Sequence, residues 1–186
     1  TSVMDIIAYG GAAVGMIVAS LLIGVFNMGR RHLTYMAWAL AASGVTVMLM
    51  GSFTSIWWIG AMAFLFFMTL PPLNTSVEVL VRSSIPNRTQ GRVWGLIGLI
   101  SQLGYIVAYA ISGVLADAVF TPLLRPGGAL ADSVGRIIGV GESRGIGLMF
   151  IGVGALMVLI APVLPRVASV RALEATAAQA LEEKKE

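Results

Sequence analysis

The chain has 186 residues, of which 58% are hydrophobic and 11% are charged, and its mean hydropathy is +0.90. A soluble globular domain carries about 25% charged residues, so this composition excludes a soluble fold, and the same figures exclude a disordered chain. The formal charge of +3 does not predict nucleic-acid binding, because the basic residues are spread through short loops rather than gathered on one face.

Few side chains suited to catalysis are present. The sequence contains no cysteine and a single histidine, His32. Disulfides, zinc–thiolate sites and a Ser-His-Asp triad within this chain are therefore excluded. No apolar segment holds paired acids or a nucleophile motif. We expect no enzymatic activity, no cofactor and no metal site.

Five apolar segments are each long enough to cross a membrane as a helix, which takes about 20 residues. Because lipid offers backbone groups no hydrogen-bond partner, such segments are predicted to be helical. The expected spans cover about residues 6–26, 33–50, 56–81, 93–116 and 146–164. The predicted fold is an all-α, polytopic membrane helix bundle within residues 1–164.

The segments between these spans alternate in charge. Basic residues follow the first, third and fifth spans, namely Arg30, Arg31, Arg82, Arg88, Arg92, Arg166, Arg171, Lys184 and Lys185. The positive-inside rule places them in the cytoplasm together with the tail, residues 165–186. We therefore expect a multi-pass protein of the cell membrane, in a bacterium the cytoplasmic membrane, with a cytoplasmic C-terminus.

The loop expected at residues 117–145 lies on the opposite, extracytoplasmic side. Its apolar residues Leu130, Val134, Ile137 and Ile138 share a helical face and predict a short interfacial helix. Five spans put the start of the chain outside, and no signal peptide precedes the first span. We expect earlier spans to be missing, with this chain as the C-terminal part of a longer protein.

The first span carries small residues at Gly11, Gly15, Ala19 or Ser20, and Gly24. This spacing allows close helix packing, or a sliding surface in a moving helix. In the fourth span, Gln102, Tyr105, Tyr109 and Ser112 share one face. That face either hydrogen-bonds to another helix or lines a cavity and touches substrate.

The third span is aromatic up to Phe67 and then contains Pro71 and Pro72, which predict a kink or local break around Leu70. Asn74 follows. Glu78 and Arg82 are four residues apart and therefore share a helical face. Two interpretations stay open for them: a structural ion pair, or a role in proton coupling or gating.

Four short stretches, residues 24–31, 85–93, 113–123 and 145–150, carry motifs in a characteristic order. Together they resemble the major facilitator superfamily of transporters, in its macrolide-efflux-like branch. Residues 85–93, Ile-Pro-Asn-Arg-Thr-Gln-Gly-Arg-Val, resemble the inner loop between the tenth and eleventh helices. Residues 113–123 are similar to the close of the eleventh helix, and residues 145–150 to the start of the twelfth. Residues 24–31, GVFNMGRR, resemble a degenerate inner-loop motif in which Asn27 and Met28 stand where an Asp-Arg pair is usual.

The resemblance implies helices eight to twelve of a twelve-helix transporter, hence a partial fold of that family. It implies proton-coupled efflux of amphipathic small molecules by alternating access around a central cavity. The substrate-binding residues would be Gln102, Tyr105, Tyr109, Phe67 and Asn74, with Glu78 and Arg82 in proton coupling or gating. The inner-loop motif residues would be Gly24, Arg30, Arg31, Gly91 and Arg92.

The expected partners are a small-molecule substrate, the lipid bilayer and the missing N-terminal helices, supplied by the same or another chain. An alternative function is a non-transport structural or assembly subunit built on a transporter-derived scaffold.

Overall fold

The computed structural model describes residues 13–21, 32–141 and 144–167, and the isolated residues 171, 172, 175 and 179. No strand occurs among them, and residues 13–21 are helical. The prediction of an all-α bundle is confirmed. The other elements in chain order are α2 (His32–Ser52), α3 (Ile56–Ser84), α4 (Asn87–Leu115), the π-helical turn η1 (Ala116–Phe120), α5 (Thr121–Leu123), α6 (Gly135–Ile138), α7 (Arg144–Ile160) and the 3-10 turn η2 (Leu164–Arg166).

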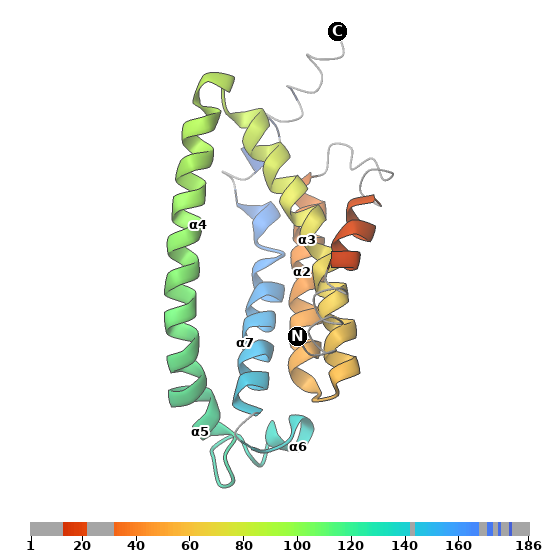
Figure 1. Cartoon of the computed structure of the whole chain (residues 1–186), viewed down its shortest axis with the longest axis vertical. Coiled ribbons are helices and arrows are strands. Elements are labelled where there is room, and N and C mark those ends of the chain that lie inside the picture. Colours follow the sequence, from red (N-terminus) through yellow and green to blue (C-terminus); the bar gives the residue numbers. More distant parts are fainter. Residues whose placement is uncertain are drawn as a thin grey trace.

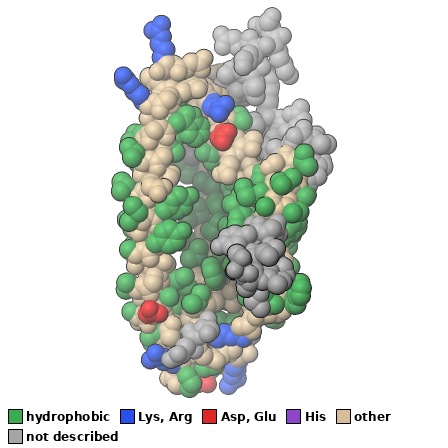
Figure 2. All heavy atoms as spheres, viewed as in Figure 1, with side chains coloured by type: hydrophobic (Ala, Val, Ile, Leu, Met, Phe, Trp, Pro, Cys, Tyr) green, Lys and Arg blue, Asp and Glu red, His purple; other side chains and the backbone are tan. Residues whose placement is uncertain are grey.

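Four helical segments in the described part are long and apolar enough to cross a membrane. They are Leu33–Ser52, Ile56–Ser84, Asn87–Leu123 and Arg144–Arg166. On the face shown in Figure 2, charged side chains lie toward the two ends, and hydrophobic side chains fill the band between them. The chain is therefore membrane-embedded.

The helices α2, α3 and α7 pack together, with α2 in the middle: it has extensive contacts with both α7 and α3. At one end of the bundle, Leu33, Met36 and Leu80 form a buried cluster that Leu73 and Leu164 extend. The α3–α4 turn lies at this same end, and the loop carrying α5 and α6 lies at the other end (Figure 1). We call these the turn end and the loop end.

Glycines bring α2 and α7 into backbone contact. A Cβ atom on Gly44 would lie 2.7 Å from the carbonyl oxygen of Gly154, and one on Gly154 would lie 2.4 Å from that of Gly44. Two helical turns further along, a Cβ on Gly51 would lie 2.3 Å from the carbonyl oxygen of Gly147. A Cβ on Gly147 would lie 2.6 Å from the carbonyl oxygen of Gly51. The two reciprocal pairs are seven residues apart on each antiparallel helix. Small residues at this spacing let helix backbones approach closely in lipid.

The helix α3 continues through Pro71 and Pro72 without interruption. Of the two predicted outcomes around Leu70, the local break is therefore wrong, and the kink stays a prediction. Side-chain hydroxyls bond to carbonyls on both sides of the prolines: Thr69 Oγ1 donates to Phe66 O at 2.7 Å, and Ser76 Oγ donates to Pro72 O at 2.8 Å. The carbonyls that lose a helix bond are instead those of Phe67 and Met68, four residues before the prolines. In a membrane helix, neighbouring helices and local adjustments accommodate such groups, so proline does not have to end the helix.

A proline does end α3 further on. Ile85 has extended backbone angles, φ −124° and ψ 128°, because the residue before a proline disfavours the helical region. Pro86 then precedes the first turn of α4. The Gln90 amide nitrogen donates to the carbonyl oxygens of Arg82 and Ile85, each at 3.3 Å. These bonds hold the start of α4 against the end of α3.

The fourth helical rod is longer than the predicted span of residues 93–116. It begins at Asn87 and, through η1 and α5, continues to Leu123, which makes 37 residues. The predicted loop at 117–145 is correspondingly shorter at its start. Charge at Arg88, Arg92 and Asp117 limits an apolar segment in the sequence, but exposed charged residues are compatible with helix beyond the hydrocarbon layer.

The remaining loop folds on itself at the loop end. Leu124 is fully buried, Ile138 is nearly so, and the Gly141 amide donates to the Leu124 carbonyl at 3.1 Å. The predicted interfacial helix is realised only as the four residues of α6, because the chain forms turns from 129 to 134. The α6 turn contacts α2 and α7, so Ile138 is buried against protein rather than lipid.

Candidate functional site

The helix α4 stands apart from the other spanning helices. It has extensive contact only with η1, which is its own continuation, and it contains no buried residue. Figure 2 shows the molecule hollowed between α4 and the remaining helices. Five glycines of α4 have no heavy atom within 4 Å of an added Cβ, namely Gly91, Gly95, Gly98, Gly104 and Gly113. In contrast to α2 and α7, α4 therefore has no glycine packed on another described helix, and most of its side chains are exposed.

The polar face predicted for α4 is present and unobstructed. Tyr105 and Tyr109 are 60% and 79% exposed, and Gln102 is exposed as well. Ser112 is half-buried, and its hydroxyl donates to the Tyr109 carbonyl at 3.0 Å. Within the described residues, neither Gln102 nor the two tyrosines form a side-chain hydrogen bond. Their polar atoms are free to bind a ligand or another helix.

The depth of this face follows from helix geometry. A rod of 37 residues is about 55 Å long, and Gln102 and Tyr105 lie within about 5 Å of its midpoint. The hydrocarbon layer is about 30 Å thick. A side-chain amide at this depth is unfavourable against lipid tails, so it faces protein or a water-filled cavity.

The structure does not join the residues predicted on α3 to those on α4. Phe67 is half-buried and stacks edge-on against Phe66, with ring centroids 5.6 Å apart. Asn74 is exposed. In the described part of the chain, no hydrogen bond or ring contact links either residue to Gln102, Tyr105 or Tyr109.

Glu78 and Arg82 are both exposed on α3, and no ion pair connects them in the described structure. The structural ion-pair interpretation is therefore not supported. Four-residue spacing brings two side chains to the same helical face, but exposed ion pairs gain little and are easily left open. Their part in proton coupling or gating stays a prediction.

The inner-loop residues divide into two groups. Gly24, Arg30 and Arg31 lie outside the described residues. Gly91 and Arg92 are exposed in the first turns of α4, and the space around Gly91 is open. In the first span, Gly11 also lies outside the described residues, whereas Gly15 packs on α3, where an added Cβ would lie 3.0 Å from Phe64 O. This contact favours the packing interpretation of that small-residue stripe.

A pocket of about 330 Å³ lies at the turn end, between the start of α2 and the residues that follow α7. Its lining is Thr34, Ala37, Trp38, Ala41, Ala161, Pro162, Pro165 and Arg166. Sequence analysis did not identify this site. Two sequence features lie in this pocket: Trp38, in the first turns of one span, and the Pro-x-x-Pro-Arg sequence of residues 162–166, at the end of another. Their proximity depends on the antiparallel pairing of α2 with α7.

No cluster of His, Asp or Glu side chains in the described part of the chain is arranged to hold a metal ion. Comparison of the chain with protein-family models, with curated proteins and with solved structures finds no match.

Proposed function

We propose that the chain is part of a membrane transporter that exports amphipathic small molecules by alternating access, coupled to protons. The observation that carries the proposal is the exposed polar and aromatic face of α4 near the middle of a membrane-length rod. A cavity with apolar walls and a few polar groups suits hydrophobic ligands that carry a polar group. The resemblance of residues 85–93 and 113–123 to the major facilitator superfamily supports the same function.

In this proposal the chain supplies one side of the cavity, and further helices of the same or another chain complete it. Gln102, Tyr105 and Tyr109 contact the substrate, while Phe67 and Asn74 contribute from α3. Glu78 is the candidate for proton coupling, because the one other acidic residue within the described spans, Asp117, lies near the end of its span. The turn end, which carries Arg82, Arg88, Arg92 and Arg166, is cytoplasmic by the positive-inside rule.

The test is efflux from the cells that naturally make the protein, measured with ethidium and a panel of other amphipathic fluorescent dyes. The triple variant Gln102→Leu, Tyr105→Phe, Tyr109→Phe removes the polar atoms and largely keeps side-chain size. We expect efflux to fall about tenfold, the effect of losing roughly one hydrogen bond to the substrate, while the amount in the membrane stays unchanged.

Ser101→Ala is the matched control, because it removes a hydroxyl from the neighbouring position on a different face of α4. Unchanged efflux in the triple variant would refute the substrate-binding assignment. An uncoupler that collapses the proton gradient tests the coupling separately, and efflux that continues without the gradient would refute it.

A structural or assembly subunit is the second candidate, and the open glycines of α4 favour it. Gly91, Gly95 and Gly98 have no neighbour within 4 Å and lie on the same face as Gln102. Such a stripe suits close approach of another helix. In that case the triple variant would reduce the amount of chain retained in its complex, and no dye would depend on the chain for efflux.

A further inference from the structure

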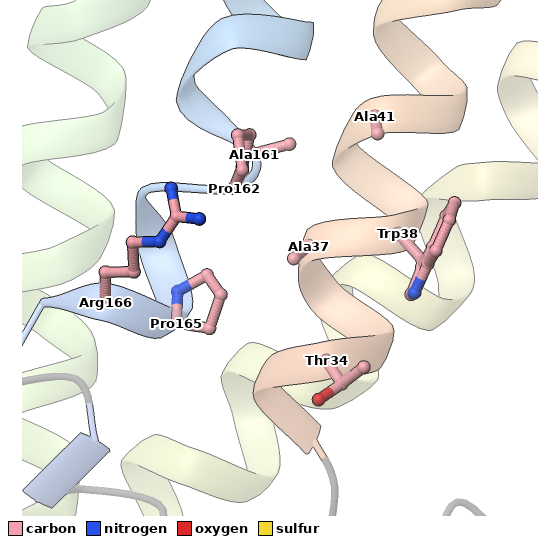
Figure 3. Close-up of a pocket in the computed structure, with 8 residues that line it drawn as sticks. All are labelled: Thr34, Ala37, Trp38, Ala41, Ala161, Pro162, Pro165 and Arg166. Carbon is pink, nitrogen blue, oxygen red and sulfur yellow. The ribbon is translucent and has the colours of Figure 1, made fainter.

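The pocket at the turn end has the chemistry of a lipid-binding groove. Six of its eight lining residues are alanine, proline or tryptophan, and the only charged group is the guanidinium of Arg166. In Figure 3, Ala37 and Pro165 face each other across the pocket, and the Arg166 guanidinium lies beside Pro162. The Trp38 ring projects from α2 at the edge of the pocket.

Its position matches the boundary between hydrocarbon and water. One spanning segment begins at Leu33 and another ends at Arg166, so the polar end of the pocket lies at the end of both. Ala37 and Ala41 continue along α2 toward the membrane interior, about 10 Å beyond Thr34. Trp38 is 73% exposed, as is typical of tryptophans at the membrane interface. The pocket thus runs from the interface into the apolar layer.

The backbone around Arg166 is fixed in place. Pro162 and Pro165 stop α7, and the Arg166 amide donates to the Val163 carbonyl at 2.9 Å. Leu164, two residues earlier, packs on the buried cluster of Leu33, Met36 and Leu80. Ala161 is 2% exposed and closes the floor of the pocket. The backbone that carries Arg166 is therefore part of a short, packed turn.

The charge of Arg166 is not neutralised within the described structure. Arg166 is exposed, and no described carboxylate forms an ion pair with it. A planar guanidinium binds the oxygens of a phosphate group in a bidentate manner. Basic residues between membrane helices, at the level of the headgroups, bind anionic lipids.

We propose that this pocket binds one anionic phospholipid, with the phosphate on Arg166 and the first part of an acyl chain along Ala37, Ala41 and Ala161. Zwitterionic lipids carry a compensating positive charge, so an arginine with no carboxylate partner among the described residues favours anionic lipids over them. The lipid covers the alanine face of α2 beside α7 and stabilises that end of the bundle. Assignment to the cytoplasmic leaflet rests on the orientation proposed above, whereas the binding itself does not.

The first test needs no substitution. The full chain is placed in nanodiscs of phosphatidylcholine alone or with 30% phosphatidylglycerol, and retained lipids are counted by native mass spectrometry. We expect one phosphatidylglycerol to be retained preferentially and the thermal unfolding temperature to be higher in its presence. Equal retention of phosphatidylcholine would overturn the proposal.

The second test compares arginines. Arg166→Gln should weaken phosphatidylglycerol retention at least about fivefold, the effect of one basic group at a membrane surface. Arg88→Gln removes a cation at the same end of the bundle, but outside the pocket, and should leave retention unchanged. Equal losses in both variants would mean general surface attraction and would overturn the proposal.

Two further arms address the nature of the ligand. Ala41→Leu fills the acyl path without changing charge and should also weaken retention; unchanged retention would refute the acyl placement. Inorganic phosphate, added to the phosphatidylcholine nanodiscs, should not raise the unfolding temperature. Full protection by phosphate alone would show a simple anion site instead of a lipid site. None of these readouts depends on efflux, so they test lipid binding independently of the transport proposal.

Discussion

The contact between α2 and α7 can be tested by adding a single methyl group. Gly154→Ala would place its Cβ 2.4 Å from the Gly44 carbonyl oxygen and 2.8 Å from the Met48 amide nitrogen. Both are backbone atoms, so no side chain can rotate away to make room. Restoring a separation of 3.0 Å moves the two backbones apart by about 0.6 Å at this point.

The expected cost follows from that displacement. Inserting a methylene or methyl group into a well-packed interface costs about 1–3 kcal/mol. A gap of 0.5–1 Å opened along the rest of the interface forfeits roughly a quarter to a half of each dispersion contact there. The neighbouring Gly51–Gly147 pair lies on the same two helices and would be loosened as well. Against this, alanine is favoured over glycine in a helix by up to about 1 kcal/mol.

A control on the same helix separates the two effects. Gly152 lies two residues away on α7, and an added Cβ there has no heavy atom within 4 Å. Gly152→Ala therefore gains helix propensity without a clash. The difference between the two variants isolates the packing cost, and we expect Gly154→Ala to be less stable than Gly152→Ala by about 1–3 kcal/mol.

The assay is reversible unfolding of the purified chain in mixed micelles with increasing sodium dodecyl sulfate, followed by the fluorescence of its four tryptophans. The unfolding midpoint of Gly154→Ala should fall well below those of the wild type and Gly152→Ala. Identical midpoints for the two variants would mean that α2 and α7 do not make backbone contact at this position, and the glycine argument would fail.

Two further predictions concern the turns that join the helices. Trp58 Nε1 donates to the Leu49 carbonyl at 2.8 Å, so Trp58→Phe should lower the free energy of unfolding by about 1 kcal/mol in the same assay. Trp57 is 73% exposed, and Trp57→Phe should leave the free energy of unfolding unchanged. The Gln90 amide ties α4 to the end of α3, so Gln90→Ala should speed hydrogen exchange of the Arg88–Arg92 amides measured by mass spectrometry. Unchanged exchange would show that Pro86 alone fixes the turn.

The hydropathy pattern predicts where the long helices lie because each is a nearly uninterrupted apolar run. The helices α2 and α3 begin within one residue of the expected 33 and 56, and α7 begins two residues before the expected 146. The pattern does not predict how they pair. Gly44, Gly51, Gly147 and Gly154 share a seven-residue period, but nothing local in the sequence assigns these glycines to each other. The lipid pocket depends on that same pairing and was missed for this reason.

Charge was a less accurate guide to helix ends. The expected fourth span starts at 93 because Arg92 and Arg88 precede it, yet α4 begins at Asn87. Charged side chains limit burial in hydrocarbon, and they do not limit helix formation in the headgroup layer or in water. The prolines gave the opposite error. Pro71 and Pro72 predict a kink or a local break, but α3 continues through both prolines while packing against α2.

The isolation of α4 connects the fold with both proposed functions. The contact between α2 and α7 shows one use of glycine in this chain, because four of their glycines meet the backbone of the other helix within 3 Å. In α4, Gly91 and Gly98 are also seven residues apart, and none of the glycines of α4 has a neighbour within 4 Å of an added Cβ. Along this face of α4, the first half carries glycines, which favour close packing of another helix. The second half carries Gln102, Tyr105 and Tyr109, which favour binding of a ligand with polar groups. Because both halves lie on one face, a partner helix that crosses α4 at an angle over Gly91, Gly95 and Gly98 would leave the polar half uncovered further along the helix. Docking and substrate binding are therefore compatible on one helix, and the efflux variants and the amount of chain in its complex distinguish which of the two the cell uses.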